Sequence, residues 1–223
     1  MSGKVLLLYG SPKGEKGASA NIAHHVIEGM RERGAEITPI GIYRSLDQQE
    51  AFDRLVKAFD EADSVVLSFP LYIDTLHAGV CEALTRLYRG KEGISQKRRK
   101  LLAICNCGFP ESRQCRSALR SCQLFAERMG MEFWGGVAIG NGGMLGGGPS
   151  HDGRINVKQT EALHALGKGL NDGGAIPAVA VELLGRSPVP PRMYTFFANM
   201  GWNATARKNG VRRKMKARPY QRS

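Results

Sequence analysis

The chain of 223 residues lacks several features that would place it in a common class. No apolar run approaches the roughly 20 residues of a membrane span, and residues 5–9 are too short for a signal-peptide core. The five cysteines form no C-x-x-C pair, which removes the usual signature of zinc ribbons and iron–sulfur clusters. An odd number of cysteines without a secretion signal favours a reducing compartment, so we expect a cytoplasmic protein without a membrane span.

The histidines also lack the spacing of metal ligands. His24 and His25 are adjacent on an expected helix and should point apart. His77, His151 and His164 have no partner at ligand spacing in the sequence. We therefore predict no metal site, and we leave a substrate contact open for His77 alone.

Strand and helix patterns alternate from residue 5 to residue 170. Apolar runs predict strands at residues 5–9, 36–42, 64–69, 101–106 and 132–139. Helical spacing of apolar residues predicts helices at 19–33, 48–61, 78–88, 112–129 and 157–170, the first of them N-capped by Ser19. Strands that are each followed by a helix predict an α/β fold with a doubly wound parallel sheet of five strands.

The most informative segment follows the first expected strand, where Gly, Ser and Lys residues open a helix at residues 10–21. Backbone N–H groups at a helix N-terminus, hydroxyls and a cation are the groups that bind a phosphate dianion. Glu15 stands where a Walker A loop needs its second glycine, and no G-x-G-x-x-G fingerprint of a dinucleotide site is present. We predict a site for one terminal phosphate, with flavin mononucleotide (FMN) as the candidate cofactor and the flavodoxin-like strand order 2-1-3-4-5. Its candidate ligands are Ser11, Lys13, Ser19, Ala20 and Asn21.

Two further loops should converge on the phosphate loop, because the carboxyl ends of parallel strands meet at one edge of the sheet. In residues 70–78, Pro70 fixes the chain and Tyr72 offers an amphipathic ring. In residues 106–112, Gly108 would let backbone approach a flat ring, while Asn106 offers polar groups to ring nitrogens and carbonyls. The candidate ring contacts are Pro70, Leu71, Tyr72, Ile73, Asn106, Cys107, Gly108 and Phe109.

Taken in order, the three loops resemble those of the flavodoxin-like NAD(P)H-dependent FMN reductase family. The matching pieces are G-S-P-K at 10–13 with Ser19 and Asn21, F-P-L-Y at 69–72 and C-G-F-P at 107–110, within roughly residues 3–145. The resemblance implies that the first loop holds the FMN phosphate and that the other two border the isoalloxazine. It also implies an oxidoreductase that takes hydride from NAD(P)H and reduces a quinone, free flavin or similar acceptor. Because the flavin carries that chemistry, we predict no catalytic side chain.

Two other functions remain open. The first is an electron carrier of the flavodoxin type, although short-chain flavodoxins are typically acidic and this chain has a net charge of +12. The second is a non-enzymatic binding module that engages an acidic partner through a basic tail. If the protein is the oxidoreductase, we expect a small-molecule acceptor and a homo-oligomer such as a dimer. Nucleic acid is then not an expected partner.

Acidic residues are absent from the end of the chain. Residues 183–223 contain ten Lys or Arg and no Asp or Glu, which leaves 22 basic against 20 acidic residues elsewhere. We therefore predict an FMN-binding domain at 1–175 and a basic extension at 176–223, partly helical at 193–208. Its aromatic residues favour packing on the domain or on a neighbouring subunit. Steering of NADPH and contact with nucleic acid or an anionic membrane are the alternatives.

Overall fold

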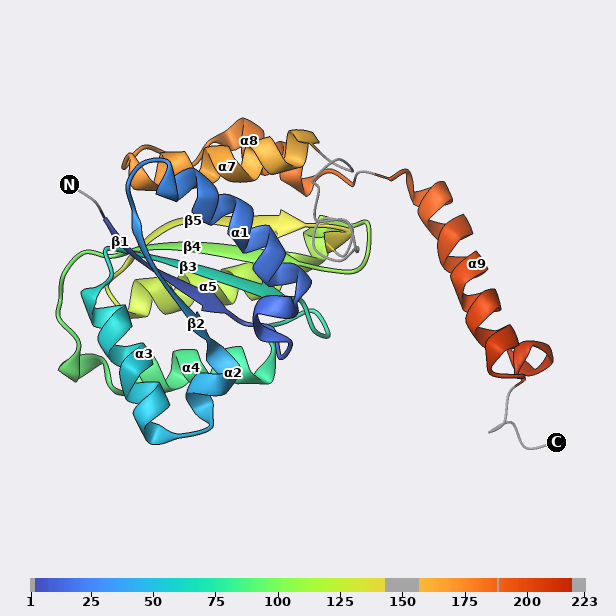
Figure 1. The fold of residues 1–223 in the computed structure, drawn as a ribbon, viewed down its shortest axis with the longest axis horizontal. Helices are drawn as coiled ribbons and strands as arrows, with labels where there is room; N and C mark the ends of the chain where they lie inside the picture. Colours follow the sequence, from blue (N-terminus) through green and yellow to red (C-terminus); the bar gives the residue numbers. More distant parts are fainter. Residues whose placement is uncertain (1–2, 143–156, 188, 218–223) are drawn as a thin grey trace. The chain divides into compact units, whose positions relative to one another are not determined.

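The computed structural model describes residues 3–142, 157–187 and 189–217, and it divides the chain into two compact units, Met1–Pro188 and Val189–Ser223 (Figure 1). The expected boundary at residue 176 falls inside the first unit. The reason is the short helix α8 (Ala178–Gly185), which packs on α7 (Val157–Asn171) and on the last strand.

The first unit is built on a parallel sheet of five strands in the order β2-β1-β3-β4-β5, which confirms the predicted fold class. Its strands are β1 (Lys4–Tyr9), β2 (Glu36–Gly41), β3 (Ser64–Pro70), β4 (Lys100–Asn106) and β5 (Glu132–Ile139). The side chains of the three central strands β1, β3 and β4 are almost all buried. A strand covered on both faces needs apolar residues at consecutive positions, which is why these strands read as continuous apolar runs.

Helices cover both faces of the sheet (Figure 1). One hydrophobic cluster contains Val5 and Leu7 and packs against α1 (Ala18–Arg31) and α7; the other contains Leu6 and Leu8 and packs against the helices of the opposite face. This division follows from the alternation of side chains along a strand. The opposite face carries α2 (Ile42–Leu46), α3 (Gln49–Glu61), α4 (Ala78–Arg89) and α5 (Arg116–Arg128).

Several helix starts differ from the predictions. The N-cap of α1 is Gly17, and Ser19 lies inside the first turn, so the predicted cap at Ser19 is wrong. The helix expected at 112–129 begins as a 3-10 turn, Ser112–Cys115, before α5. The short helices α2 and α8 were not predicted, because neither is long enough to show an amphipathic repeat. Further 3-10 turns lie at Gly14–Lys16 and Lys91–Gly93.

One basic residue of the first unit is buried. Arg99 is 2% exposed, although it belongs to a run of four consecutive cations at residues 97–100. Its guanidinium donates to the carbonyl oxygens of Phe59 (2.9 Å), Asp60 (2.8 Å) and Ser95 (2.7 Å) and to the carboxylate of Asp60 (2.6 Å). Arg99 therefore joins the end of α3 to the segment that leads into β4.

The second unit consists of α9 (Pro191–Lys208) and a 3-10 turn, Arg212–Lys214. A proline at the first helical position starts α9, which agrees with the helix expected at 193–208. Large apolar side chains of α9 are exposed, including Phe196 (65%) and Trp202 (68%). Packing of this unit on a domain or subunit stays a prediction.

Among the helices that the structure describes, none combines the length and the apolarity needed to cross a bilayer.

Candidate functional site

The loops at the carboxyl ends of β1, β3 and β4 are joined by buried hydrogen bonds. The Ser19 hydroxyl donates to Oδ1 of Asn106 (2.8 Å), and the Ser68 hydroxyl donates to the carbonyl oxygen of Ser19 (2.7 Å). The N–H of Leu71 donates to the carbonyl oxygen of Asn106 (2.8 Å). The start of α1 and the ends of β3 and β4 therefore form one surface, as the strand order requires.

Asn106 is hydrogen-bonded to both neighbouring loops, through its side chain to Ser19 and through its carbonyl oxygen to Leu71. Its side chain is 6% exposed, its Oδ1 is used by Ser19, and a Cβ at Gly142 would lie 2.7 Å from its Nδ2. We expect the polar groups of Asn106 to face a flavin ring, and in the structure its Oδ1 accepts the Ser19 hydroxyl at the start of α1. A contact between Asn106 and a ring stays a prediction.

The β1 loop is compact around Ser11. The Ser11 hydroxyl is buried and accepts the N–H of Lys13 (3.2 Å), while the Ser11 carbonyl accepts the N–H of Gly14 (2.9 Å). A Cβ at Gly17 would lie 2.8 Å from Ser11 Oγ, so a side chain at this position would displace the Ser11 hydroxyl. No acceptor for the Ser11 hydroxyl proton exists among the described residues. Buried hydroxyls normally have one, and a ligand oxygen would supply it.

The first turn of α1 offers backbone donors beside this hydroxyl. The N–H groups of Ala20 and Asn21 donate to the Gly17 carbonyl (3.0 and 3.3 Å), so these two predicted ligands use their amides inside the helix. The amides that precede them, at Ala18 and Ser19, lie in the first turn, where no carbonyl one turn earlier is available. Together with the exposed Lys13 they form a donor set suited to a phosphate.

The β3 loop folds into a tight hairpin. Tyr72 and Thr75 exchange two backbone hydrogen bonds (3.3 and 3.1 Å), and the two residues between them have positive φ, 46° at Ile73 and 59° at Asp74. This turn has the positive φ angles of type I′, which favour Asn or Gly, so a β-branched residue such as Ile73 is strained there. Strained residues cluster at functional sites. The turn leaves Tyr72 46% and Ile73 96% exposed.

Two side chains support the Tyr72 ring: His77, the histidine with the open substrate contact, and Tyr43, which no sequence pattern singled out. His77 lies edge-on to Tyr72, with ring centroids 4.3 Å apart, and its Nε2 is 3.2 Å from the hydroxyl of Tyr43. The Tyr43 hydroxyl also accepts the N–H of Gly79 (3.2 Å). Tyr43 lies 34 residues before His77, so no local pattern could pair them.

The β4 loop presents Gly108 and Phe109 to solvent, and Phe109 is 56% exposed. A Cβ built on Gly108 meets no described atom within 4 Å. Beneath them, hydrogen bonding with the Cys115 thiol and burial raise the pKa of Cys107, so Cys107 is a neutral thiol at physiological pH. The loop therefore offers backbone and an aromatic face rather than a nucleophile.

Two hollows that the structure describes lie at the opposite edge of the sheet. One is lined by residues that include Lys4, Glu36 and Arg54, and the other by residues that include Asp63 and Lys100. Ligands of open α/β sheets bind at the carboxyl ends of the strands. We therefore place the candidate site at the three loops and not at these hollows.

Comparisons with known proteins agree with the fold. No curated protein matches the chain. A quinone oxidoreductase that uses NAD(P)H, from Methanothermobacter marburgensis, is 19% identical, with a TM-score of 0.55, over 76% of this chain and 96% of its own. A WrbA-like flavodoxin from Agrobacterium tumefaciens is 15% identical, with a TM-score of 0.55, over 81% and 99%. An FMN-dependent NADH-azoreductase from Bacillus anthracis, solved with FMN, is 13% identical, with a TM-score of 0.54, over 75% and 99%.

The family model described as "Flavodoxin-like fold" matches residues 3–144, which is more than half of the chain and contains all three loops. The chain therefore belongs to the family with the flavodoxin-like fold.

Proposed function

We propose that this protein is an FMN-dependent oxidoreductase that takes hydride from NAD(P)H and reduces a quinone, free flavin or similar small acceptor. The observation that carries the proposal is the meeting of a phosphate-type donor set at the β1 loop with exposed aromatic residues on the β3 and β4 loops. Solved structures with the same fold include an NAD(P)H:quinone oxidoreductase and an FMN-dependent azoreductase, which supports this class of activity.

The residues present fit FMN. The Ser11 hydroxyl, the Lys13 cation and the amides of Ala18 and Ser19 would bind the terminal phosphate. Tyr72, Phe109 and the backbone at Gly108 would border the ring, together with the other predicted ring contacts on the same two loops. When bound, FMN would supply hydride acceptance and electron transfer, while the protein would bind and orient it.

The proposal is tested by loading the purified full chain with FMN and mixing it with NADH or NADPH and a soluble quinone. We expect the nicotinamide to be oxidised in proportion to protein, and we expect riboflavin to support less oxidation than FMN. A protein that binds no flavin overturns the proposal. A protein that binds FMN but oxidises neither nicotinamide acts as an electron carrier of the flavodoxin type instead.

A further inference from the structure

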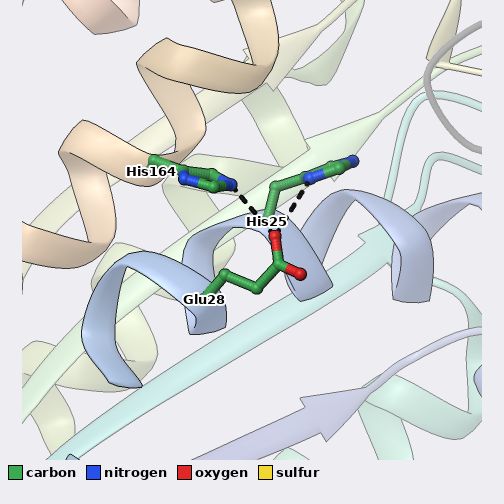
Figure 2. Close-up of side chains that lie close together, drawn as sticks. All are labelled: His25, Glu28 and His164. Carbon is green, nitrogen blue, oxygen red and sulfur yellow. Dashed lines mark hydrogen bonds and ion pairs between the residues drawn. The ribbon is translucent and has the colours of Figure 1, made fainter. Parts of the chain in front are cut away.

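Three side chains that could bind a metal meet where α1 lies beside α7. They are His25 and Glu28 of α1 and His164 of α7, and their ligand atoms lie within 4.8 Å of one another (Figure 2). The histidines showed no ligand spacing in the sequence, because Glu28 and His164 are 136 residues apart. His151, the other histidine of that region, lies outside the described residues.

Two glycines bring the helices close enough for this meeting. A Cβ on Gly29 would lie 2.2 Å from the carbonyl oxygen of His164, and a Cβ on Gly167 would lie 2.0 Å from that of Val26. Any side chain at either position would force the helices apart. The close crossing places His164 directly over the turn of α1 that carries His25 and Glu28.

The two separations that involve Glu28 are close to those between the ligands of a tetrahedral metal. His164 Nε2 is 3.0 Å and His25 Nδ1 is 3.6 Å from Oε2 of Glu28. Ligands bound to Zn²⁺ at about 2.0–2.1 Å lie about 3.3 Å from one another in a tetrahedron. His25 Nδ1 is buried, and it has no hydrogen-bond partner among the described residues. Figure 2 shows that this nitrogen and His164 Nε2 both point toward the Glu28 carboxylate.

The surroundings resemble the outer shell of a metal site. His164 Nδ1 faces Oε1 of Glu32 at 3.9 Å, and Lys168 holds Glu32 at 2.6 Å. The second oxygen of Glu28 lies 3.0 Å from His24 Nε2. Outer carboxylates and hydrogen bonds of this kind fix the orientation of histidine and carboxylate ligands.

We propose that His25, Glu28 and His164 form a site for a divalent transition metal, Zn²⁺ first, that ties α1 to α7. Two imidazoles and one carboxylate are a ligand set that Zn²⁺ accepts, with water in the fourth position. The partly exposed side chains, 20% for His25, 40% for Glu28 and 28% for His164, leave that position open to solvent. The site does not depend on the proposed flavin chemistry, since its ligands lie apart from the three loops.

Titration of the chelator-treated full chain, kept reduced, with ZnCl₂ against a chromophoric chelator tests the proposal. We expect one Zn²⁺ per chain and a melting temperature that rises with Zn²⁺. His25→Gln and His164→Gln should each weaken binding at least tenfold and abolish the rise in melting temperature. Circular dichroism of both variants without metal should match that of the parent chain.

The neighbouring His24 contacts Glu28 but is not one of the three proposed ligands, so its replacement separates a ligand from a supporting group. His24 is 57% exposed and His25 only 20%, so His24→Gln should keep one Zn²⁺ per chain and weaken binding less than His25→Gln. CoCl₂ should give the visible spectrum of a tetrahedral site without strong sulfur-to-cobalt absorption. Equal losses in the His24 and His25 variants, no stoichiometric binding, or a thiolate spectrum would each overturn the proposal.

Discussion

The two units of the chain use the same residue types in opposite ways. In the first unit, Phe59 and Phe69 are 1% and 0% exposed, whereas Phe196 and Phe197 of α9 are 65% and 51% exposed. Acidic and basic residues nearly balance up to residue 182, while the rest of the chain is basic without any acid. The first unit therefore buries the large aromatic residues of its core, and among its exposed apolar side chains are those of the β3 and β4 loops. The second unit exposes its large aromatic residues, and their packing against a partner stays a prediction.

Replacing one arginine from each unit compares a buried cation with an exposed one. Arg99→Met should lower the free energy of unfolding by about 3–5 kcal/mol, because one buried and several partly buried acceptors would lose their donor at once. Arg213→Met in the exposed tail should change it by less than about 0.5 kcal/mol. Urea denaturation of both variants measures the difference. Equal effects would mean that burial does not distinguish the two units.

Gly108→Val tests the site without disturbing the first unit. A Cβ there meets no described protein atom, so the fold and the melting temperature should be retained. If the backbone at Gly108 lies against the flavin ring, valine should weaken FMN at least tenfold, or about 1.4 kcal/mol. Fluorescence titration with FMN measures the affinity, and Gly93→Val, at an open glycine before β4 rather than after it, is the control. Unchanged affinity would remove this loop from the site.

Removal of residues 189–223 should have the smallest effect on the fold of the first unit, since the chain divides after Pro188. If the exposed aromatics of α9 pack on a domain or subunit, truncation should change the oligomer or lower the melting temperature, also at high salt. A tail that only steers NAD(P)H would affect the reaction rate alone, and 1 M salt would erase that effect because the Debye length falls to about 3 Å. Sizing and thermal melting at both salt concentrations decide between the two.

The fold could be predicted because the patterns that indicate each strand lie within that strand and the loop that follows it. Apolar runs predict the strand ends to within one residue, and the phosphate-type loop after the first strand predicts the strand order. Short elements such as α8 could not be predicted, since their packing partners and not their own pattern make them helical. Nor does a run of four cations show that Arg99 is the buried one.

The loops of the candidate site could be predicted, but their internal contacts could not. The sequence predicts Ser19 as a helix cap, yet its hydroxyl donates a hydrogen bond to Asn106, which lies 87 residues away. Tyr43 and His77 pair across 34 residues, and Glu28 and His164 across 136. Such pairs depend on the crossing of elements in space, and one sequence contains no signal for them.

A comparison of FMN with riboflavin tests whether the β1 loop holds the phosphate of a bound flavin. The parent chain should bind FMN more tightly, and replacing Ser11 and Lys13 together with alanine should remove most of that preference. Each charged hydrogen bond lost should cost about 1.5–3 kcal/mol for FMN and leave riboflavin nearly unchanged. Equal weakening of FMN and riboflavin, or no preference in the parent chain, would mean that the β1 loop does not hold the flavin phosphate.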